Sequence, residues 1–121
     1  MDTDSVSDLS YLNEIAMGDQ SIVIEVTETF LSDAPNALKE IKKHSRDRNW
    51  SALAKVAHKV KPNFKYMGMD RASEIIVDIE QQAKSEDISA DLDHQIDELV
   101  QLSDQAFDEL ASKLESLKKN N

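Results

Sequence analysis

The chain has 121 residues, which is enough for one domain with a hydrophobic core and too short for two. It contains no cysteine, which excludes disulfides and thiol chemistry, and it has no run of 18 apolar residues that could span a membrane. Its net charge of −10 disfavours non-specific binding to nucleic acid. We expect a single cytoplasmic domain, residues 1–121, with residues 1–6 frayed.

Only two glycines and two prolines occur in the chain, so the composition favours helices over hairpins and loops. Apolar spacing predicts a short helix from about Asp8 to Met17, ended by Gly18. Asp19 is a suitable N-cap for a long second helix that reaches about residue 44. Pro35 lies inside this helix and is expected either to kink it or to split it in two.

A third helix is predicted after Asn49, a plausible N-cap, and Gly68 closes it. Asp70 opens a fourth helix that extends to about Lys84. Ser89 is the expected N-cap of a long last helix with leucines at steps of three and four. The predicted fold is all-α: an antiparallel up-down four-helix bundle with a short additional N-terminal helix.

Charge is unevenly distributed along the chain. The segment from Lys39 to Arg71 has ten basic and three acidic side chains, a net charge of +7, whereas the remaining residues have four basic and 21 acidic ones. Such asymmetry indicates where an oppositely charged partner binds. A local anionic ligand or an acidic protein surface suits this segment.

The stretch from Trp50 to Gly68 combines a core-facing apolar stripe with a single histidine on the opposite side. Helical spacing places His58 on an outward face with three lysines, and smaller side chains occupy the preceding turns: Lys55, Lys61 and Lys65, then Ala54 and Ser51. Neutral imidazole is a suitable nucleophile towards an anionic phosphoryl or acyl group, which nearby lysines would hold. A surface histidine on a lysine-rich docking face explains the same spacing equally well.

The other chemistry-bearing residues favour plainer interpretations. His44 lies at a basic helix end and reads as a capping side chain, and His94 reads as a surface residue near a helix start. Asp91 and His94 have a possible ligand spacing, but no matching pair occurs on another helix, so no metal or cofactor is expected. The chain also lacks a glycine-rich phosphate loop.

The segment A-H-K-V-K-P-N-F-K-Y-M-G-M resembles the phosphorylation site of histidine-containing phosphotransfer (HPt) domains. That family's pattern is a histidine, any residue, an aliphatic residue, lysine, glycine and two small residues, with a further glycine ten positions after the histidine. The corresponding residues here are His58, Val60, Lys61 and the distal Gly68. An early leucine-rich helix, Gly-Asp before a long helix with F-x-x-x-x-P, and a link that ends in Asn-Trp extend the likeness through most of the chain.

The resemblance implies a phosphorelay intermediate. His58 would accept a phosphoryl group from an aspartyl phosphate on one receiver domain and pass it to another. Lys61 would pair with the phosphate, with Lys55 and Lys65 adding positive charge; Ser51, Ala54, Lys59, Pro62 and Gly68 would form the docking surface. The implied partners are response-regulator receiver domains and hybrid sensor histidine kinases. Mg²⁺ and most of the catalytic apparatus would belong to the receiver, so the chain would be a carrier rather than an enzyme. A monomer suits such a shuttle.

Two positions depart from the family pattern. Pro62 replaces the glycine that follows the lysine, and it should free the His58 carbonyl and bend the helix there. Lys65 stands where the family has a small residue. We hypothesise that Pro62 stiffens the surface and so selects particular receivers.

Two other functions remain open at this point. A non-phosphorylated helical adaptor could bind an acidic partner through the basic segment 39–71, which would explain the charge asymmetry. A metal-binding bundle is a third interpretation, with Asp91 and His94 as its only suggestive spacing.

Overall fold

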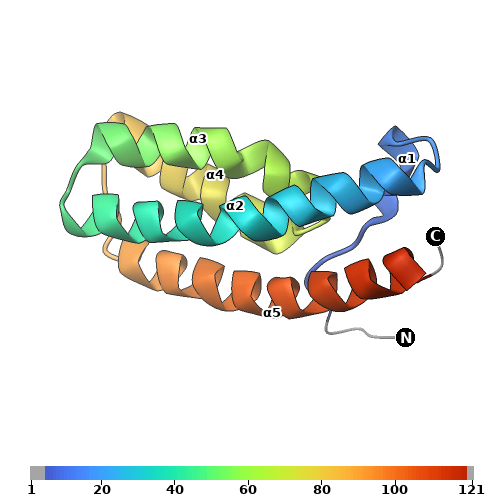
Figure 1. The fold of residues 1–121 in the computed structure, drawn as a ribbon. Coiled ribbons are helices and arrows are strands. Elements are labelled where there is room, and N and C mark those ends of the chain that lie inside the picture. The colour runs from blue at the N-terminus through green and yellow to red at the C-terminus, as the bar shows by residue number, and fades with distance from the viewer. Residues whose placement is uncertain (1–4, 120–121) are drawn as a thin grey trace.

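The computed structural model describes residues 5–119 and is helical throughout that range, apart from the N-terminal segment and short links. Its helices are α1 (Ser10–Ile15), α2 (Gln20–Arg46), α3 (Trp50–Tyr66), α4 (Asp70–Ser85) and α5 (Leu92–Lys119) (Figure 1). The last four form the bundle, in which α3 packs most extensively on α4, and α2 packs on both α3 and α5. The short α1 lies at the end of the bundle away from the α2–α3 link (Figure 1). The predicted bundle with an additional N-terminal helix is confirmed.

Side-chain caps fix two of the helix starts. The carboxylate of Asp19 accepts a hydrogen bond from the Ser21 amide, and the side-chain oxygen of Asn49 accepts one from the Ala52 amide. Both caps agree with the sequence prediction. Pro35 does not split the second helix, because α2 continues through it as one element. Proline removes a single backbone hydrogen bond, and the buried Phe30, Ala34 and Leu38 keep both halves of α2 packed on the core.

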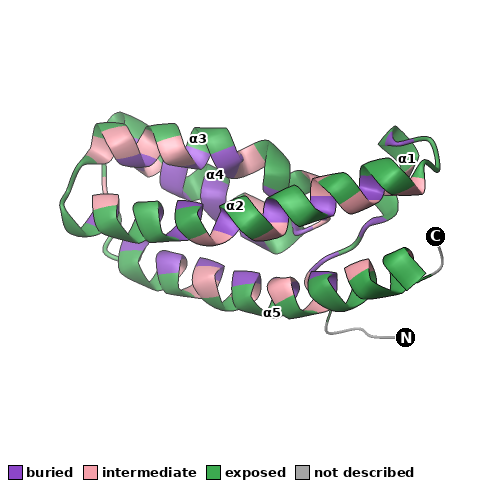
Figure 2. Cartoon of the chain, in the orientation of Figure 1, coloured by how far each residue is buried: buried purple, intermediate pink, exposed green. Residues whose placement is uncertain are grey.

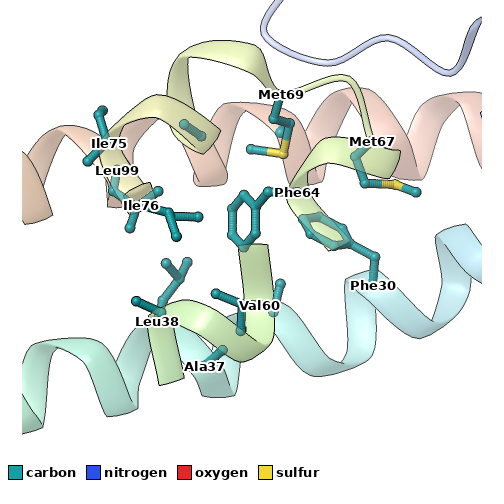
Figure 3. Packing of buried hydrophobic residues seen from close by; sticks show 14 of the residues in the cluster. Phe30, Ala37, Leu38, Val60, Phe64, Met67, Met69, Ile75, Ile76 and Leu99 are labelled. Carbon is teal, nitrogen blue, oxygen red and sulfur yellow. The ribbon is translucent and has the colours of Figure 1, made fainter. Parts of the chain in front are cut away.

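Purple, buried positions face the interior on every helix of the bundle (Figure 2). At the centre, the fully buried Phe64 of α3 meets Phe30 of α2 edge to face, with ring centroids 5.1 Å apart. Met67 and Met69 continue this core beyond the end of α3 (Figure 3). Phe64 therefore anchors the inner side of the helix whose outer side carries His58. No helix within residues 5–119 is long and apolar enough to cross a membrane.

Residues 5–9, here called the N-terminal strap, run from α5 to the start of α1 (Figure 1). Residues 1–6 are expected to be frayed; among them, Ser5 and Val6 both donate hydrogen bonds to the carboxylate of Glu109 on α5. Residues 1–4 lie outside the described part of the chain. A carboxylate in mid-helix gave no sequence signal that it would bind a segment about a hundred residues away.

Candidate functional site

His58 lies on the middle of α3 and points away from the core. Its neighbours Ala57 and Val60 are buried, whereas the imidazole side chain is 70% exposed. This is the outward orientation that helical spacing predicts, since Phe64 and Leu53 hold the opposite face of α3 in the interior. An exposed ring on a rigid helix is open to a reactant on a partner protein.

A buried carboxylate on the next helix holds the imidazole. The Nδ1 of His58 lies 2.8 Å from Oε2 of Glu80 on α4, and the Nζ of Lys61 lies 3.0 Å from the other carboxylate oxygen. Lys84 adds a more distant contact of 3.7 Å to Oε2. Because an ionised carboxylate can only accept, Nδ1 carries the proton, and the lone pair of a neutral ring is on Nε2. Glu80 thus orients the ring and leaves the Nε2 lone pair free.

The ionised state of Glu80 follows from its surroundings. Its side chain is only 3% exposed, and burial by itself raises the pKa of this carboxyl. The hydrogen bonds and positive charges of Lys61 and His58 outweigh burial, so the pKa of Glu80 lies below its ordinary value. The site therefore keeps a buried negative charge directly behind the imidazole.

The predicted phosphate-stabilising lysines occupy different places. Lys61 lies beside the imidazole and is 37% exposed; one of its N–H groups bonds to Glu80, and an ammonium has two more donors. Lys55, one turn before His58, is exposed on the same face. Lys65 lies apart, because its ammonium stands over the ring of Tyr11 on α1, 6.0 Å from the centroid. The structure thus brings together His58 and Lys61, and it holds Lys65 towards α1.

The predicted docking residues are also distributed unevenly. Ser51 is exposed and Ala54 is half-buried on the turns before His58. Because both side chains are small, they leave space on that side of the imidazole. Pro62 is exposed and stands within a continuous α3, so the His58 carbonyl lacks its usual intrahelical donor. Gly68 has φ +66°, and the backbone of Asp8 covers it: a Cβ built there would lie 2.1 Å from the Asp8 oxygen. Internal packing thus requires this glycine, and its part in docking stays a prediction.

A groove of about 560 Å³ runs between α2 and α3; Lys59 lines it, whereas His58 itself does not. Its floor is apolar and includes Phe30, Val60 and Phe64. Lys59, the residue after His58, lies on its α3 rim, and acidic side chains lie on its α2 rim: Glu25, Asp33 and Glu40. The groove is therefore mixed in charge along its two rims, whereas the totals for segment 39–71 indicate a basic surface.

Sequence reasoning missed Glu80 and Lys84. A signal for Glu80 was present, because it follows Ile76 by four residues and precedes Ala83 by three, on the apolar side of α4. A carboxylate at such a position is buried and needs a cationic partner. The sequence could not tell that the partners would be His58 and Lys61 of the preceding helix.

The other histidines lie away from this cluster. His44 is half-buried in the last turn of α2, and His94 is exposed in the first turn of α5. Within residues 5–119, no group of three or more histidine, aspartate or glutamate side chains is arranged to hold a metal ion.

Comparison with known proteins gives a family match. The family model described as "Hpt domain" matches residues 25–120, which comprise most of α2 and all of α3, α4 and α5. No curated protein and no solved structure gives a significant match. The matched range contains His58, Lys61 and Glu80, whereas the N-terminal strap and α1 precede it.

Proposed function

Because the chain belongs to the histidine-containing phosphotransfer (HPt) family, we propose that His58 is its phosphoacceptor and that the protein relays a phosphoryl group between receiver domains. HPt domains are phosphotransfer intermediates of two-component signalling, and they are phosphocarrier modules that interact with receiver domains and kinases, not catalysts. Beyond this family role, we assign His58 as the phosphoacceptor, describe its chemistry and propose transfer from one receiver domain to another. The chain would act as a monomer, since one copy contains every residue that the proposed transfer requires.

The observation that carries the proposal is the hydrogen bond of 2.8 Å between His58 Nδ1 and the buried Glu80. In accepting a phosphoryl group, the Nε2 lone pair attacks phosphorus, the P–O bond to the receiver's aspartate breaks, and that carboxylate leaves. The ring then carries a positive charge, and the Glu80 carboxylate stabilises it through Nδ1–H. In donating the group onward, the same ring is the leaving group and returns to its neutral form.

Lys61 and Lys55 would serve the phosphoryl oxygens. The ammonium of Lys61 is held next to the imidazole by Glu80 yet keeps donors that the carboxylate does not use. Lys55 lies one turn earlier on the same face and adds positive charge there. None of the ion pairs described for this site involves it. We do not assign Lys65 to the phosphate, because its ammonium is held over Tyr11.

The receiver would dock over the exposed ridge of α3 and the adjoining groove. Ser51 and Ala54 leave room on one side of His58, and Lys59 and Pro62 stand on the ridge itself. The apolar floor of the groove offers burial to a partner helix, and the acidic α2 rim favours basic side chains at its margin.

The test is phosphoryl transfer from a panel of receiver domains labelled with radioactive acetyl phosphate. We expect acid-labile, base-stable label on the wild-type protein and no label on His58→Gln. His44→Gln is the matched control, since it changes another helical histidine that lies away from Glu80 and should keep full labelling. Wild-type labelling of His58→Gln would refute the assignment. Absence of label from every receiver, together with binding that survives His58→Ala, would favour the adaptor that docks an acidic partner through segment 39–71.

A further inference from the structure

The N-terminal strap is fastened to the bundle by one carboxylate. Glu109 of α5 accepts hydrogen bonds from the backbone amides of Val6 and Ser7 and from the hydroxyl groups of Ser5 and Ser7. Ser7 is 5% exposed, so its contacts are shielded from water. Burial raises the pKa of Glu109, but these hydrogen bonds and one from the Gln105 side chain lower it by more, which keeps the carboxylate ionised at neutral pH.

The same strap is also attached to the end of the phosphoacceptor helix. The Asp8 amide donates to the Met67 carbonyl over 2.9 Å, and the Asp8 backbone lies directly against Gly68. Just beyond the strap, Tyr11 of α1 stacks on Tyr66 with ring centroids 6.2 Å apart. The strap and α1 thus hold the segment from Tyr66 to Gly68 from outside, while Phe64 holds α3 from inside.

This segment forms one end of the docking groove. Tyr66 and Met67 line the groove, together with Asn63 from the same last turn of α3. Upstream of them, Pro62 has no N–H, so the helix lacks the hydrogen bond that would tie this turn to the His58 carbonyl. The last turn therefore relies on external contacts for its position more than an uninterrupted helix would.

We propose that Glu109 is a positioning residue: by fastening the N-terminal strap, it fixes the end of α3 and thereby the shape of the groove on which a receiver docks. This inference rests on the proposed function, and it concerns residues that precede or lie far from the phosphorylation motif. Glu109 does not act on the imidazole, which Glu80 of α4 orients independently. Different residues therefore position the docking groove and the imidazole.

The test compares Glu109→Ala with Glu115→Ala. Glu115 is on the same helix and its side chain is 70% exposed, with an ion pair to Lys119 and no strap contact among those described. A double variant, Ser5→Ala with Ser7→Ala, removes two donors and leaves Glu109 in place. Three readouts are measured: amide hydrogen exchange, labelling of His58 by phosphoramidate, and KM for the receiver domain that transfers best to the wild-type protein. Phosphoramidate phosphorylates the imidazole directly, with ammonia as the leaving group, and needs no docking.

In Glu109→Ala and in the double variant, we expect the amides of Asp8, Met67 and Gly68 to exchange about ten-fold faster, with no such change in Glu115→Ala. We expect the receiver KM to rise about five-fold and phosphoramidate labelling to stay at the wild-type rate. Unchanged exchange at these amides would overturn the proposal, as would faster exchange with an unchanged KM. If phosphoramidate cannot label the wild-type protein at His58, the proposed phosphoacceptor is refuted instead. The exchange result would still decide whether Glu109 fixes the end of α3 through the strap.

Discussion

Replacing Glu80 with alanine should change which nitrogen of His58 carries the proton. In the wild-type protein the carboxylate accepts from Nδ1 at 2.8 Å, and this bond favours the tautomer with a free Nε2 lone pair. A hydrogen bond to a charged group contributes about 1.5–3 kcal/mol when it is shielded from water. Because the imidazole is 70% exposed, we take about 1 kcal/mol, which corresponds to a roughly five-fold change in the ratio of the two tautomers.

The assay is ¹⁵N NMR of the neutral imidazoles. His44 and His94 lie outside the Glu80 cluster, so their signals serve as internal controls in the same spectrum. Glu80→Ala should shift the His58 pattern away from the Nδ1–H tautomer and slow phosphoramidate labelling about five-fold. Glu74→Ala, an exposed glutamate on the same helix, should change neither. An unchanged His58 pattern in Glu80→Ala would refute the inference that the carboxylate selects the nucleophilic nitrogen.

Two further predictions concern stability. The folded-state pKa of Glu80 lies below its ordinary value of about 4.5, so the ionised carboxylate stabilises the fold above that pH, and this contribution is lost as the pH falls through the folded-state pKa. The gap in unfolding free energy between wild type and Glu80→Gln should therefore narrow from pH 7 to pH 3 in urea titrations, and a gap that stays constant would contradict the assignment. Phe64→Ala should lower the free energy of unfolding by about 3–5 kcal/mol, because the ring is fully buried against Phe30. Val77→Ala, at a 40% exposed position, should lower it by less than about 0.5 kcal/mol. Similar losses for both variants in urea titrations would mean that Phe64 is not a central core residue.

Helix positions were predictable because local chemistry determines them. Asp19 and Asn49 cap α2 and α3 as expected, and the apolar stripe of the third helix correctly places His58 outside the core. The first helix is shorter than predicted, since Asp8 accepts a hydrogen bond from the Ser10 amide ahead of a helix that starts at Ser10. Pro35 leaves α2 undivided because tertiary packing supports both sides of it.

Contacts between distant segments were not predictable in the same way. Helical spacing grouped Lys65 with His58, but the stack of Tyr11 on Tyr66 brings an aromatic ring within reach of that lysine and turns it towards α1. Glu109 is one of 24 acidic residues in the sequence, and its contacts depend on donors at the opposite end of the chain. Periodicity reports which face a residue occupies, but not which segment covers that face.

The two halves of α3 are supported by different parts of the molecule. The half with His58 and Lys61 is tied to α4 through Glu80, and the end at Met67 and Gly68 is tied to α5 through the strap and Glu109. Pro62 stands between them and removes the backbone hydrogen bond that would join the His58 carbonyl to the following turn. Changes at Glu80 should therefore act on nucleophile chemistry with any phosphoryl donor, and changes at Glu109 only where a protein partner must dock. Such a division would let receiver preference change through the N-terminal segment, which precedes the family match, without altering the phosphoacceptor.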